Sequence, residues 1–335
     1  MTASDFLELT TKLLDIVVNV TYIVSNIKLA ARKLFNAAAA RVVSHDCRRD
    51  GSTMNMNSNP LSMPHLAQFQ RDGFIILRGL FDAEEVGLLG KAAKEDRVLD
   101  QNSFGRNDGS GGNIRLSLWS DPGDNLYGMF ARCERIVGSM EQILGGPVGH
   151  YHSKMIMKDA KVGGAWEWHQ DYGYWYDIGY LSPDLASVMI AVDKATKENG
   201  CLQVIKGSHR LGRINHTETG QQAGADLTRV REVLDKLELV YCEMDPGDAV
   251  FFHSNMLHRS DQNLSENPRW AMICCYSLIG NDSAHDPLHP NPLKPVIKVA
   301  DSAIRDAGML RFATGDGNNT FLNPNKHLGE EVASR

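Results

Sequence analysis

Two histidines, one aspartate and one arginine are the residues whose types and spacing could do chemistry. His169 and Asp171 are separated by a single residue, His258 follows much later, and Arg269 lies eleven positions beyond it. Two imidazoles and one carboxylate form a three-ligand set that leaves positions on a ferrous ion open to a substrate and oxygen. A guanidinium suits the carboxylate of a cosubstrate. The pattern therefore indicates an iron-dependent oxygenase.

The spacing of His169 and Asp171 has a physical reason if this stretch is extended. Side chains at positions i and i+2 of a strand project to the same face, so both residues can hold one metal while Gln170 points away. His258 must then come from a second strand that folds back beside the first, which a β architecture provides. A single His-x-Asp is a weak signal, because histidines near acids also occur in ordinary cores and surfaces.

Three segments around these residues favour a β-rich site. The run from Trp166 to Trp175 is dense in aromatic residues, which either wall a dry pocket or form simple strand core. Residues 198–210 are typical of a turn, a short strand and a second turn. Residues 244–253 place a tight turn before an apolar strand that leads toward His258.

The segments WHQDYGYW, NGCLQVIKGSHRLG and DPGDAVFFHSNMLHRSDQN, followed by Arg269, resemble the phytanoyl-CoA dioxygenase family of iron(II)/2-oxoglutarate oxygenases, which includes ectoine hydroxylases. Residues 69–81 are similar to that family's opening strand, and the resemblance runs from about residue 64 to about residue 280. Several ordered motifs form a stronger signal than any single one. The resemblance implies a mainly β fold, a double-stranded β-helix (jelly roll, cupin-like) with flanking α-helices.

The resemblance also implies an iron site and a cosubstrate site, residue by residue. His169, Asp171 and His258 would hold Fe(II) and form the catalytic triad. Arg269 would pair with the far carboxylate of 2-oxoglutarate, and Ser260 would add a hydrogen bond to the same carboxylate. O2 would bind at the iron.

A second set of positions is expected to shape the pockets. Lys154 and Arg115 fall near positions where relatives contact the cosubstrate, although solvated basic side chains are an equal alternative. Trp175 occupies a position that lines the substrate cavity in the ectoine-hydroxylase branch, and Tyr174 beside it is expected to contact the same molecule. Met189 stands where some relatives have a tryptophan, so this wall of the cosubstrate pocket is expected to differ.

The implied reaction is hydroxylation of an unactivated C–H bond, with release of succinate and CO2. Asp171 favours hydroxylation over halogenation, because halogenases of this superfamily replace that carboxylate with a small residue so that chloride can bind. Desaturation and ring formation would use the same triad, and both stay open. The alternative function is a jelly roll that binds metal or 2-oxoglutarate as a sensor, without turnover.

Composition restricts the partners and the compartment. The chain has 335 residues, 42% of them hydrophobic and 23% charged, and a formal net charge of −6. This charge, and the lack of a basic run with interleaved aromatics, argue against a nucleic-acid partner. No basic cluster suited to a CoA phosphate stands out, so the expected substrate is a small free metabolite. The six cysteines include no C-x-x-C pair, which is typical of a reducing, cytoplasmic compartment.

The sequence divides into an N-terminal extension (residues 1–60), an oxygenase domain (61–285) and a C-terminal surface segment (286–335). The extension has apolar residues at helical spacing, followed by a polar linker. This amphipathic helix could associate with a membrane or serve in targeting, but its polar residues favour a dispensable extension. The sequence gives no indication of an oligomeric state.

Local signals also predict elements inside the domain. Asp82 and the acids after it predict a helix to about residue 97, and a second helix is predicted over residues 126–144. The Gly-rich residues 104–113 predict a flexible loop, either a mobile lid or a plain surface loop. A polar insertion at residues 211–237 is expected to shape substrate access.

Overall fold

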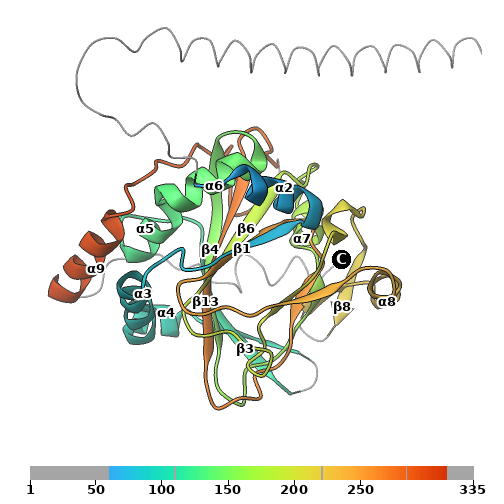
Figure 1. Cartoon of the computed structure of the whole chain (residues 1–335), viewed down its shortest axis with the longest axis horizontal. Coiled ribbons are helices and arrows are strands. Elements are labelled where there is room, and N and C mark those ends of the chain that lie inside the picture. Colours follow the sequence, from blue (N-terminus) through green and yellow to red (C-terminus); the bar gives the residue numbers. More distant parts are fainter. Residues whose placement is uncertain (1–59, 109–110, 220–221, 284, 315–335) are drawn as a thin grey trace, which may run out of the picture. The chain divides into compact units, whose positions relative to one another are not determined.

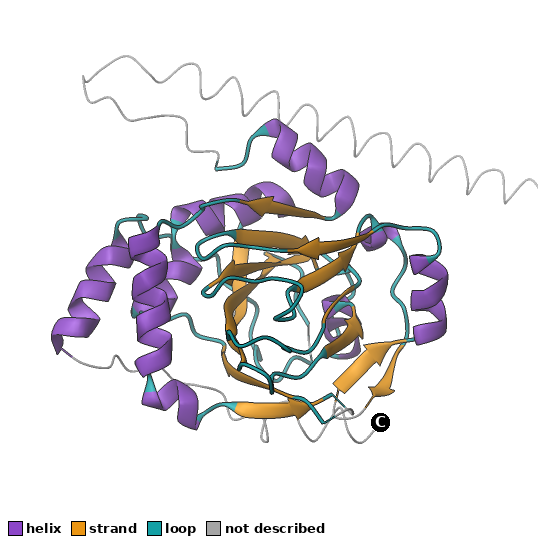
Figure 2. Ribbon diagram, turned by 60° about the horizontal axis from the view of Figure 1, so that its bottom comes forward, coloured by secondary structure: helices purple, strands orange, loops and turns teal. Residues whose placement is uncertain are grey.

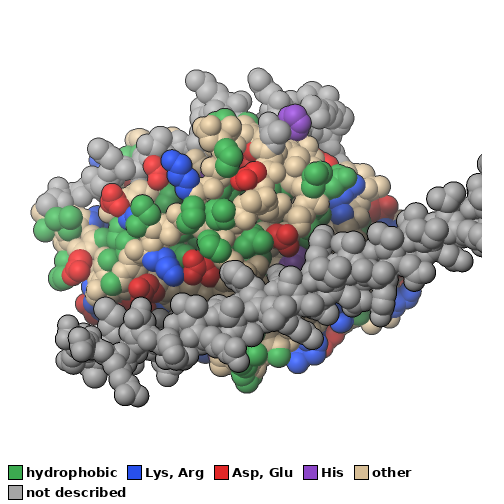
Figure 3. All heavy atoms as spheres, turned by 90° about the horizontal axis from the view of Figure 1, so that it is seen from above, with side chains coloured by type: hydrophobic (Ala, Val, Ile, Leu, Met, Phe, Trp, Pro, Cys, Tyr) green, Lys and Arg blue, Asp and Glu red, His purple; other side chains and the backbone are tan. Residues whose placement is uncertain are grey.

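The computed structural model describes residues 60–314, except 109–110, 220–221 and 284. All described residues belong to one compact unit, which lies within Ser58–Arg335. The amphipathic helix and nearly all of the linker expected in residues 1–60 therefore lie outside the described residues. None of the described helices is both long and apolar enough to cross a membrane. On the face shown in Figure 3, hydrophobic side chains are intermingled with acidic and basic ones.

Antiparallel strands form the centre of the described unit (Figures 1 and 2). The larger sheet has seven strands, in the spatial order β1 (Phe74–Leu77), β11 (Ala249–His253), β6 (Leu185–Ala191), β13 (Arg269–Leu278), β4 (Val148–Lys158), β3 (Asn113–Trp119) and β2 (Phe104–Asn107). The smaller sheet has four, in the order β10 (Leu239–Cys242), β7 (Leu202–Ile205), β12 (His258–Ser260) and β5 (Trp166–His169). A separate hairpin consists of β8 (His216–Thr219) and β9 (Gln222–Ala225). Together the two main sheets form the jelly roll that the sequence predicted.

The central strands of the larger sheet are buried on both faces. In β6, Val188 and Ile190 belong to a core shared with the helices, whereas Met189 and Ala191 belong to a core shared with residues of the smaller sheet such as Leu202. This position explains why β6 reads as an apolar run instead of alternating with polar residues. The strands of the smaller sheet that carry His169 and His258 therefore border an apolar core.

Helices cover the outer face of the larger sheet and the ends of the roll (Figure 1). They are α2 (Met63–Asp72), α3 (Ala83–Glu95), α4 (Arg97–Gln101), α5 (Leu126–Arg132), α6 (Glu134–Leu144), α7 (Asp171–Asp177), α8 (Leu227–Leu234) and α9 (Ala303–Thr314), with a 3-10 turn at Ser208–Arg210. The core against the larger sheet includes residues of α3, α5 and α6, and Ile304 of α9. The expected C-terminal surface segment thus contains a helix that contributes to the core.

The prediction of a single helix over residues 126–144 is wrong, because the chain forms two helices that meet at Cys133. Cys133 has an extended backbone (φ −62°, ψ 148°) and forms a parallel bridge with Val299. The amide of Glu134 donates to the Val299 carbonyl (3.1 Å), and the Val299 amide donates to the Arg132 carbonyl (3.0 Å). The returning C-terminal segment therefore uses backbone groups that a continuous helix would have consumed.

Two further expectations about local structure need correction. The opening strand is limited to Phe74–Leu77, because residues 63–72 form α2, and Gly73 ends that helix with φ +82°. A left-handed residue at this position is a common helix ending and suits glycine. Residues 104–107 and 113, expected as parts of a flexible loop, belong to β2 and β3, which pair as an antiparallel hairpin. The insertion at residues 211–237 contains β8, β9 and α8.

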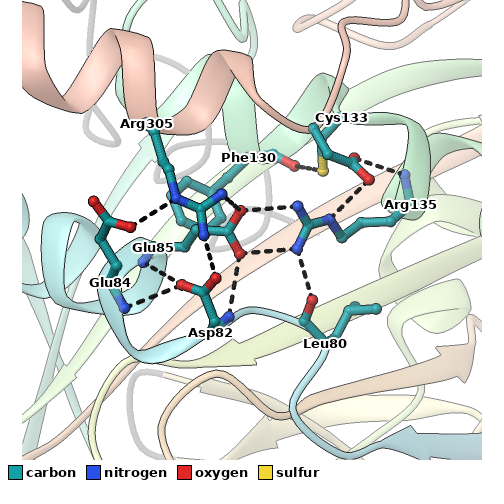
Figure 4. A network of polar contacts seen from close by, with 9 residues as sticks. Leu80, Asp82, Glu84, Glu85, Phe130, Cys133, Arg135 and Arg305 are labelled. Atoms are coloured by element: carbon teal, nitrogen blue, oxygen red, sulfur yellow. Dashed lines mark hydrogen bonds and ion pairs between the residues drawn. The ribbon is translucent and has the colours of Figure 1, made fainter.

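A polar network joins α3, α6 and α9 (Figure 4). As predicted, Asp82 caps α3, and it forms a reciprocal capping box with Glu85. Glu85 is almost fully buried, and its carboxylate accepts hydrogen bonds from Arg135 (2.8 Å) and Arg305 (3.1 Å). Two guanidinium groups from later helices thus compensate one buried carboxylate, which fixes how α6 and α9 dock on α3.

A second buried ion pair ties the end of α9 to the helix layer. The Arg311 guanidinium donates to the Asp96 carboxylate at 3.0 Å, and the side chains of both residues are at most 6% exposed. The same carboxylate accepts hydrogen bonds from the Tyr127 hydroxyl (3.0 Å) and the Leu99 amide (2.9 Å). Arg311 therefore neutralises a charge at the junction of α3, α4 and α5.

Replacing Arg311 should destabilise the fold strongly, whereas breaking a surface ion pair should not. The Arg311→Met variant should lose about 3 kcal/mol of unfolding free energy, because it leaves the Asp96 charge buried without its guanidinium. The matched variant Lys298→Met breaks the partly exposed pair with Glu141 (2.9 Å) and should cost no more than about 1 kcal/mol. Urea unfolding monitored by circular dichroism measures both. Equal losses would contradict the larger contribution that we expect from the buried Arg311–Asp96 pair.

Candidate metal and cosubstrate site

The two histidines of the predicted triad lie side by side on neighbouring strands. β5 pairs antiparallel with β12, and His169 stands directly opposite His258. Their ring centroids are 4.0 Å apart. Among the described residues, His169, Asp171 and His258 are the group of potential ligands whose donor atoms lie close enough together for a metal ion, within 4.8 Å of one another. All three side chains are buried.

Asp171 does not belong to the same strand as His169, which corrects the expectation of a fully extended motif. β5 ends at His169, and Asp171 is the first residue of α7. Gln170 between them keeps an extended backbone (φ −112°, ψ 128°), so the side chains on either side of it still project toward one centre. The Gln170 side chain points away, as predicted: its oxygen accepts from the Ile214 amide (2.7 Å) and its nitrogen donates to the Asn255 carbonyl (3.0 Å).

Backbone carbonyls fix the tautomers of both imidazoles. The Nδ1 atom of His169 lies 2.8 Å from the Glu167 carbonyl oxygen, and that of His258 lies 2.9 Å from the Met256 carbonyl oxygen. A carbonyl only accepts, so each Nδ1 carries the proton and each Nε2 keeps a lone pair for a metal. Burial, followed by the neighbouring His169, lowers the pKa of His258 to about 3, so this ring is neutral at physiological pH.

The Asp171 carboxylate faces both imidazoles. Its Oδ1 atom lies 3.7 Å from Nε2 of His169 and 3.8 Å from Nε2 of His258. Burial alone would raise the pKa of Asp171, but the nearby His169, His258 and Lys154 side chains outweigh this effect and hold the pKa well below its ordinary value. Two metal bonds of about 2.1 Å can span such distances, and neutral imidazoles with a carboxylate suit Fe(II). The donor set therefore fits the implied metal.

A cavity opens in front of the triad and carries both polar and apolar walls. Its polar lining, besides the triad, consists of Lys154, Arg259, Ser260 and Arg269. Its apolar lining consists of Ile114, Ile156, Trp166, Met189, Leu202, Phe252 and Ile273. Met189, expected to alter one wall of the cosubstrate pocket, is thus part of that wall. A mostly apolar cavity with a few convergent polar groups is typical of a small-molecule site.

Arg269 is a buried cation whose hydrogen-bonding capacity is largely unused. The residue is 2% exposed, and its Nη2 donates to the Gly200 carbonyl at 2.8 Å. Its Nε and Nη1 atoms are buried and have no hydrogen-bond partner among the described residues. Burial lowers the pKa of Arg269 to about 10, so it remains charged at neutral pH. A charged guanidinium with two unused donor nitrogens at the wall of the cavity fits a carboxylate ligand.

Ser260 and Lys154 also reach the cavity, whereas Arg115 does not. Ser260 follows His258 by two positions on β12 and lines the same space, as does Lys154 on β4. Arg115 neighbours Ile114 on β3 and projects to the opposite face, where it pairs with Asp100 (2.7 Å) and Asp159 (3.0 Å). The expected cosubstrate contact by Arg115 is therefore not formed, because the strand turns this side chain away from the site.

The two expected substrate residues occupy different surroundings. The Tyr174 ring lies 5.5 Å from the His169 ring, and its hydroxyl donates to the Ala223 carbonyl (2.5 Å). Trp175 is buried, and its ring packs against Tyr151 (5.3 Å between centroids). Tyr174 is thus adjacent to a metal ligand, whereas Trp175 belongs to the aromatic core beside it.

One residue at the site was missed by the sequence reasoning. The Ser187 hydroxyl donates to Oδ2 of Asp171 at 3.1 Å and also lies 3.2 Å from the Cys275 sulfur. This bond leaves Oδ1 of Asp171 directed at the histidines. The available signal was a serine in the middle of the apolar segment LASVMIA, since a lone polar residue in a buried strand needs a partner.

Comparisons with known sequences agree with this geometry. Residues 69–271 match the family model described as phytanoyl-CoA dioxygenase. The chain is 34% identical over 185 residues to L-proline trans-4-hydroxylase from Streptomyces griseoviridis, a match that covers 50% of this chain and 68% of that protein. It is 26% identical over 283 residues to ectoine dioxygenase from Bordetella parapertussis, with 76% of this chain and 88% of that protein covered.

Solved structures support the same fold. EctD from S. alaskensis, solved with 2-oxoglutarate and 5-hydroxyectoine, has a TM-score of 0.60 at 24% identity, covering 72% of this chain and 88% of EctD. The epimerase SnoN, solved with Fe3+ and α-ketoglutarate, has a TM-score of 0.57 at 21% identity, covering 71% and 93%. These likenesses support the fold, and the sequence match supports the lineage: the chain belongs to the phytanoyl-CoA dioxygenase family of iron(II)/2-oxoglutarate-dependent oxygenases.

Proposed function

We propose that this dioxygenase hydroxylates an unactivated C–H bond of a small organic metabolite. In this proposal His169, Asp171 and His258 hold Fe(II), while Arg269, Ser260 and Lys154 hold 2-oxoglutarate. When bound, the iron, 2-oxoglutarate and O2 supply the oxidising power, and succinate and CO2 are released with the hydroxylated product. The relatives named for L-proline and ectoine make these two compounds the first candidates to test.

The observation that carries the proposal is the unpaired Arg269 guanidinium in the same cavity as the triad. A buried cation with two unused donor nitrogens is costly unless an anion completes it. The far carboxylate of 2-oxoglutarate would supply that anion, with Ser260 and Lys154 as further donors. The sensor alternative is disfavoured, because the named relatives are hydroxylases and dioxygenases.

The residues of this chain contribute orientation and exclusion of water. The Glu167 and Met256 carbonyls hold the imidazoles by their Nδ1 protons, so Nε2 is available without rearrangement. Ser187 holds the second oxygen of Asp171, which limits rotation of this carboxylate. Apolar side chains such as Phe252 and Ile273 line the cavity and keep it dry. The triad is thereby organised before any ligand enters.

The state of the cysteines supports the proposed compartment. The cysteines at positions 133, 201, 242, 274 and 275 are free and buried, which suits a reducing compartment such as the cytoplasm.

Tyr174, beside His169, is proposed to contact the substrate. Trp175 is proposed to act indirectly, by packing against Tyr151 at the edge of the site.

Replacing His169 should abolish iron retention without unfolding the chain. The His169→Ala variant loses one of three ligands, whereas His285→Ala, at an exposed histidine, provides the matched control. Iron content after anaerobic loading and desalting should fall to background in the first variant and stay at the wild-type level in the second. Thermal melts of the iron-free proteins should coincide. A His169→Ala protein that retains iron normally would refute this ligand assignment.

Replacing Arg269 should weaken 2-oxoglutarate binding by about tenfold to a hundredfold, as expected for a charge-assisted bond worth about 1.5–3 kcal/mol. The matched control is Arg115→Ala, which removes an arginine that points away from the cavity and should leave the affinity unchanged. Anaerobic titration of the iron-loaded proteins with 2-oxoglutarate measures both. If Arg269→Ala binds normally, or if Arg115→Ala shows the larger loss, the cosubstrate assignment is wrong.

Removing the Ser187 hydroxyl should lower iron affinity by about tenfold, because outer hydrogen bonds to metal ligands typically contribute this much or more. The variant Ser187→Ala should leave thermal stability close to that of Ser139→Ala, which removes an equally buried hydroxyl bonded to the Arg135 carbonyl (2.6 Å). Competition for Fe(II) with a chelator distinguishes the two variants. Equal iron affinities would show that Asp171 keeps its orientation without Ser187.

A further inference from the structure

Arg106 on β2 is a partly buried cation that has no anionic partner among the described residues. Its guanidinium forms no ion pair or hydrogen bond with them, and its central carbon lies 5.2 Å from the centre of the Phe104 ring. Burial lowers its pKa, although an arginine remains charged at neutral pH. A stacking contact on phenylalanine leaves the guanidinium donors unused.

The strand register directs Arg106 to the cavity side of the hairpin. Arg106 stands directly opposite Ile114, and Ile114 lines the cavity in front of the triad. Directly opposed residues of an antiparallel pair project to the same face. Phe104 and Leu116, the next pair on this face, pack in the core between the two sheets. Arg115, between Ile114 and Leu116, points the other way.

The hairpin that carries Arg106 is firmly seated against the entry to β5. The Asp108 carboxylate accepts hydrogen bonds from the Ala165 amide (2.8 Å) and the Gln262 side chain (2.9 Å). Gly112 touches Gly164 backbone to backbone, since a Cβ added to Gly164 would lie 2.6 Å from the Gly112 carbonyl carbon. Arg106 is thus held in place relative to the metal-binding strand.

Tyr174 connects Arg106 to the metal site. The Arg106 and Tyr174 side chains lie within electrostatic range of each other. The Tyr174 ring lies 5.5 Å from His169, and Trp166, which lines the cavity, lies 6.0 Å from the same histidine. Arg106 therefore lies on the side of the cavity where Tyr174 and Trp166 flank His169.

The cations that line the cavity, unlike Arg106 on the bordering hairpin, already have partners or proposed roles. Arg259 donates to Gln203 (3.0 Å) and pairs with Asp261 (3.0 Å). Arg269 and Lys154 are the proposed 2-oxoglutarate contacts. Arg106 is consequently the cation that remains available for a second anionic molecule.

We propose that Arg106 binds the carboxylate of the substrate and makes the enzyme selective for small carboxylate-bearing metabolites. This inference rests on the proposed function and specifies its substrate class. A planar guanidinium matches the two oxygens of a carboxylate, and the partly dry surroundings strengthen such a bond relative to water. The Phe104 face behind the guanidinium would hold it flat while it binds.

The first test compares acids with their neutral amides. Wild-type protein loaded anaerobically with Fe(II) and 2-oxoglutarate is titrated with L-proline and L-prolinamide, and with a panel of small cyclic and acyclic amino acids paired with their amides. Isothermal calorimetry measures binding without requiring turnover. We expect the bound compounds to be acids, each at least tenfold tighter than its amide. Equal binding of both members of a pair, or a panel in which no acid binds, overturns the proposal.

The second test uses variants of Arg106 on the tightest acid of that panel. Arg106→Gln should raise the dissociation constant and KM for the acid by about tenfold to a hundredfold, and should abolish the preference for acid over amide. Arg106→Lys should restore part of the preference. The matched control Arg97→Gln, at an exposed arginine on α4, should behave like wild type.

Two readouts separate this proposal from its alternatives. If Arg106 serves only to support the hairpin through Phe104, Arg106→Gln will lower the melting temperature and weaken acid and amide binding equally. If Arg106 instead contacts the cosubstrate, the dissociation constant of 2-oxoglutarate will rise, and the substrate assignment is overturned. A wild-type protein that fails to bind 2-oxoglutarate contradicts the proposed function itself, before the comparison of acid with amide is reached.

Discussion

The antiparallel pairing of β5 with β12 is the constraint on which the candidate site depends. It sets His169 opposite His258, and β7 on the other side of β12 fixes the same register by pairing His258 with Val204. A shift of one residue would turn either imidazole to the opposite face of the sheet. Because each Nδ1 bonds to a carbonyl of its own chain segment, the pairing also sets the direction of both Nε2 atoms. Asp171 then needs only one extended residue to reach the same centre.

The fold buries several charged side chains, and it compensates their charges in two different ways. Far from the cavity, buried carboxylates are fully paired: Glu85 with two guanidinium groups, and Asp96 with Arg311 and Tyr127. At the cavity, the Gly200 carbonyl is the one hydrogen-bond partner of Arg269 within the described part of the chain. A buried charge without a counterion costs free energy that a bound anion can recover. The structural pairs thus stabilise the fold, whereas the incomplete pair favours ligand binding.

How much the sequence predicts depends on how local the determining contacts are. The helix start at Asp82 and the closeness of the His169 and Asp171 side chains are determined within a few residues, and both agree with the structure. The break at Cys133 depends on Val299, which reaches it from the far end of the domain, so no local signal indicates it. The direction of Arg115 and the role of Ser187 follow from strand pairing, which an isolated sequence does not specify. The grouping of His169, Asp171 and His258 was therefore predictable, and its supporting contacts were not.

Arg269 and Arg106 lie at different depths, and this difference suggests the order in which two anionic ligands would bind. Arg269 is almost fully buried beside the triad, whereas Arg106 is only partly buried, on the hairpin that borders the cavity. In the proposed arrangement, a dianionic cosubstrate that reached Arg269 and Lys154 would offset the positive charge beside the triad, and Arg106 would remain as the cation for a later anion. Each ligand would then meet a guanidinium that has already lost part of its hydration shell and is held by its neighbours, so little reorganisation accompanies binding. Preorganised cations at different depths would thus discriminate cosubstrate from substrate, although both carry the same kind of group.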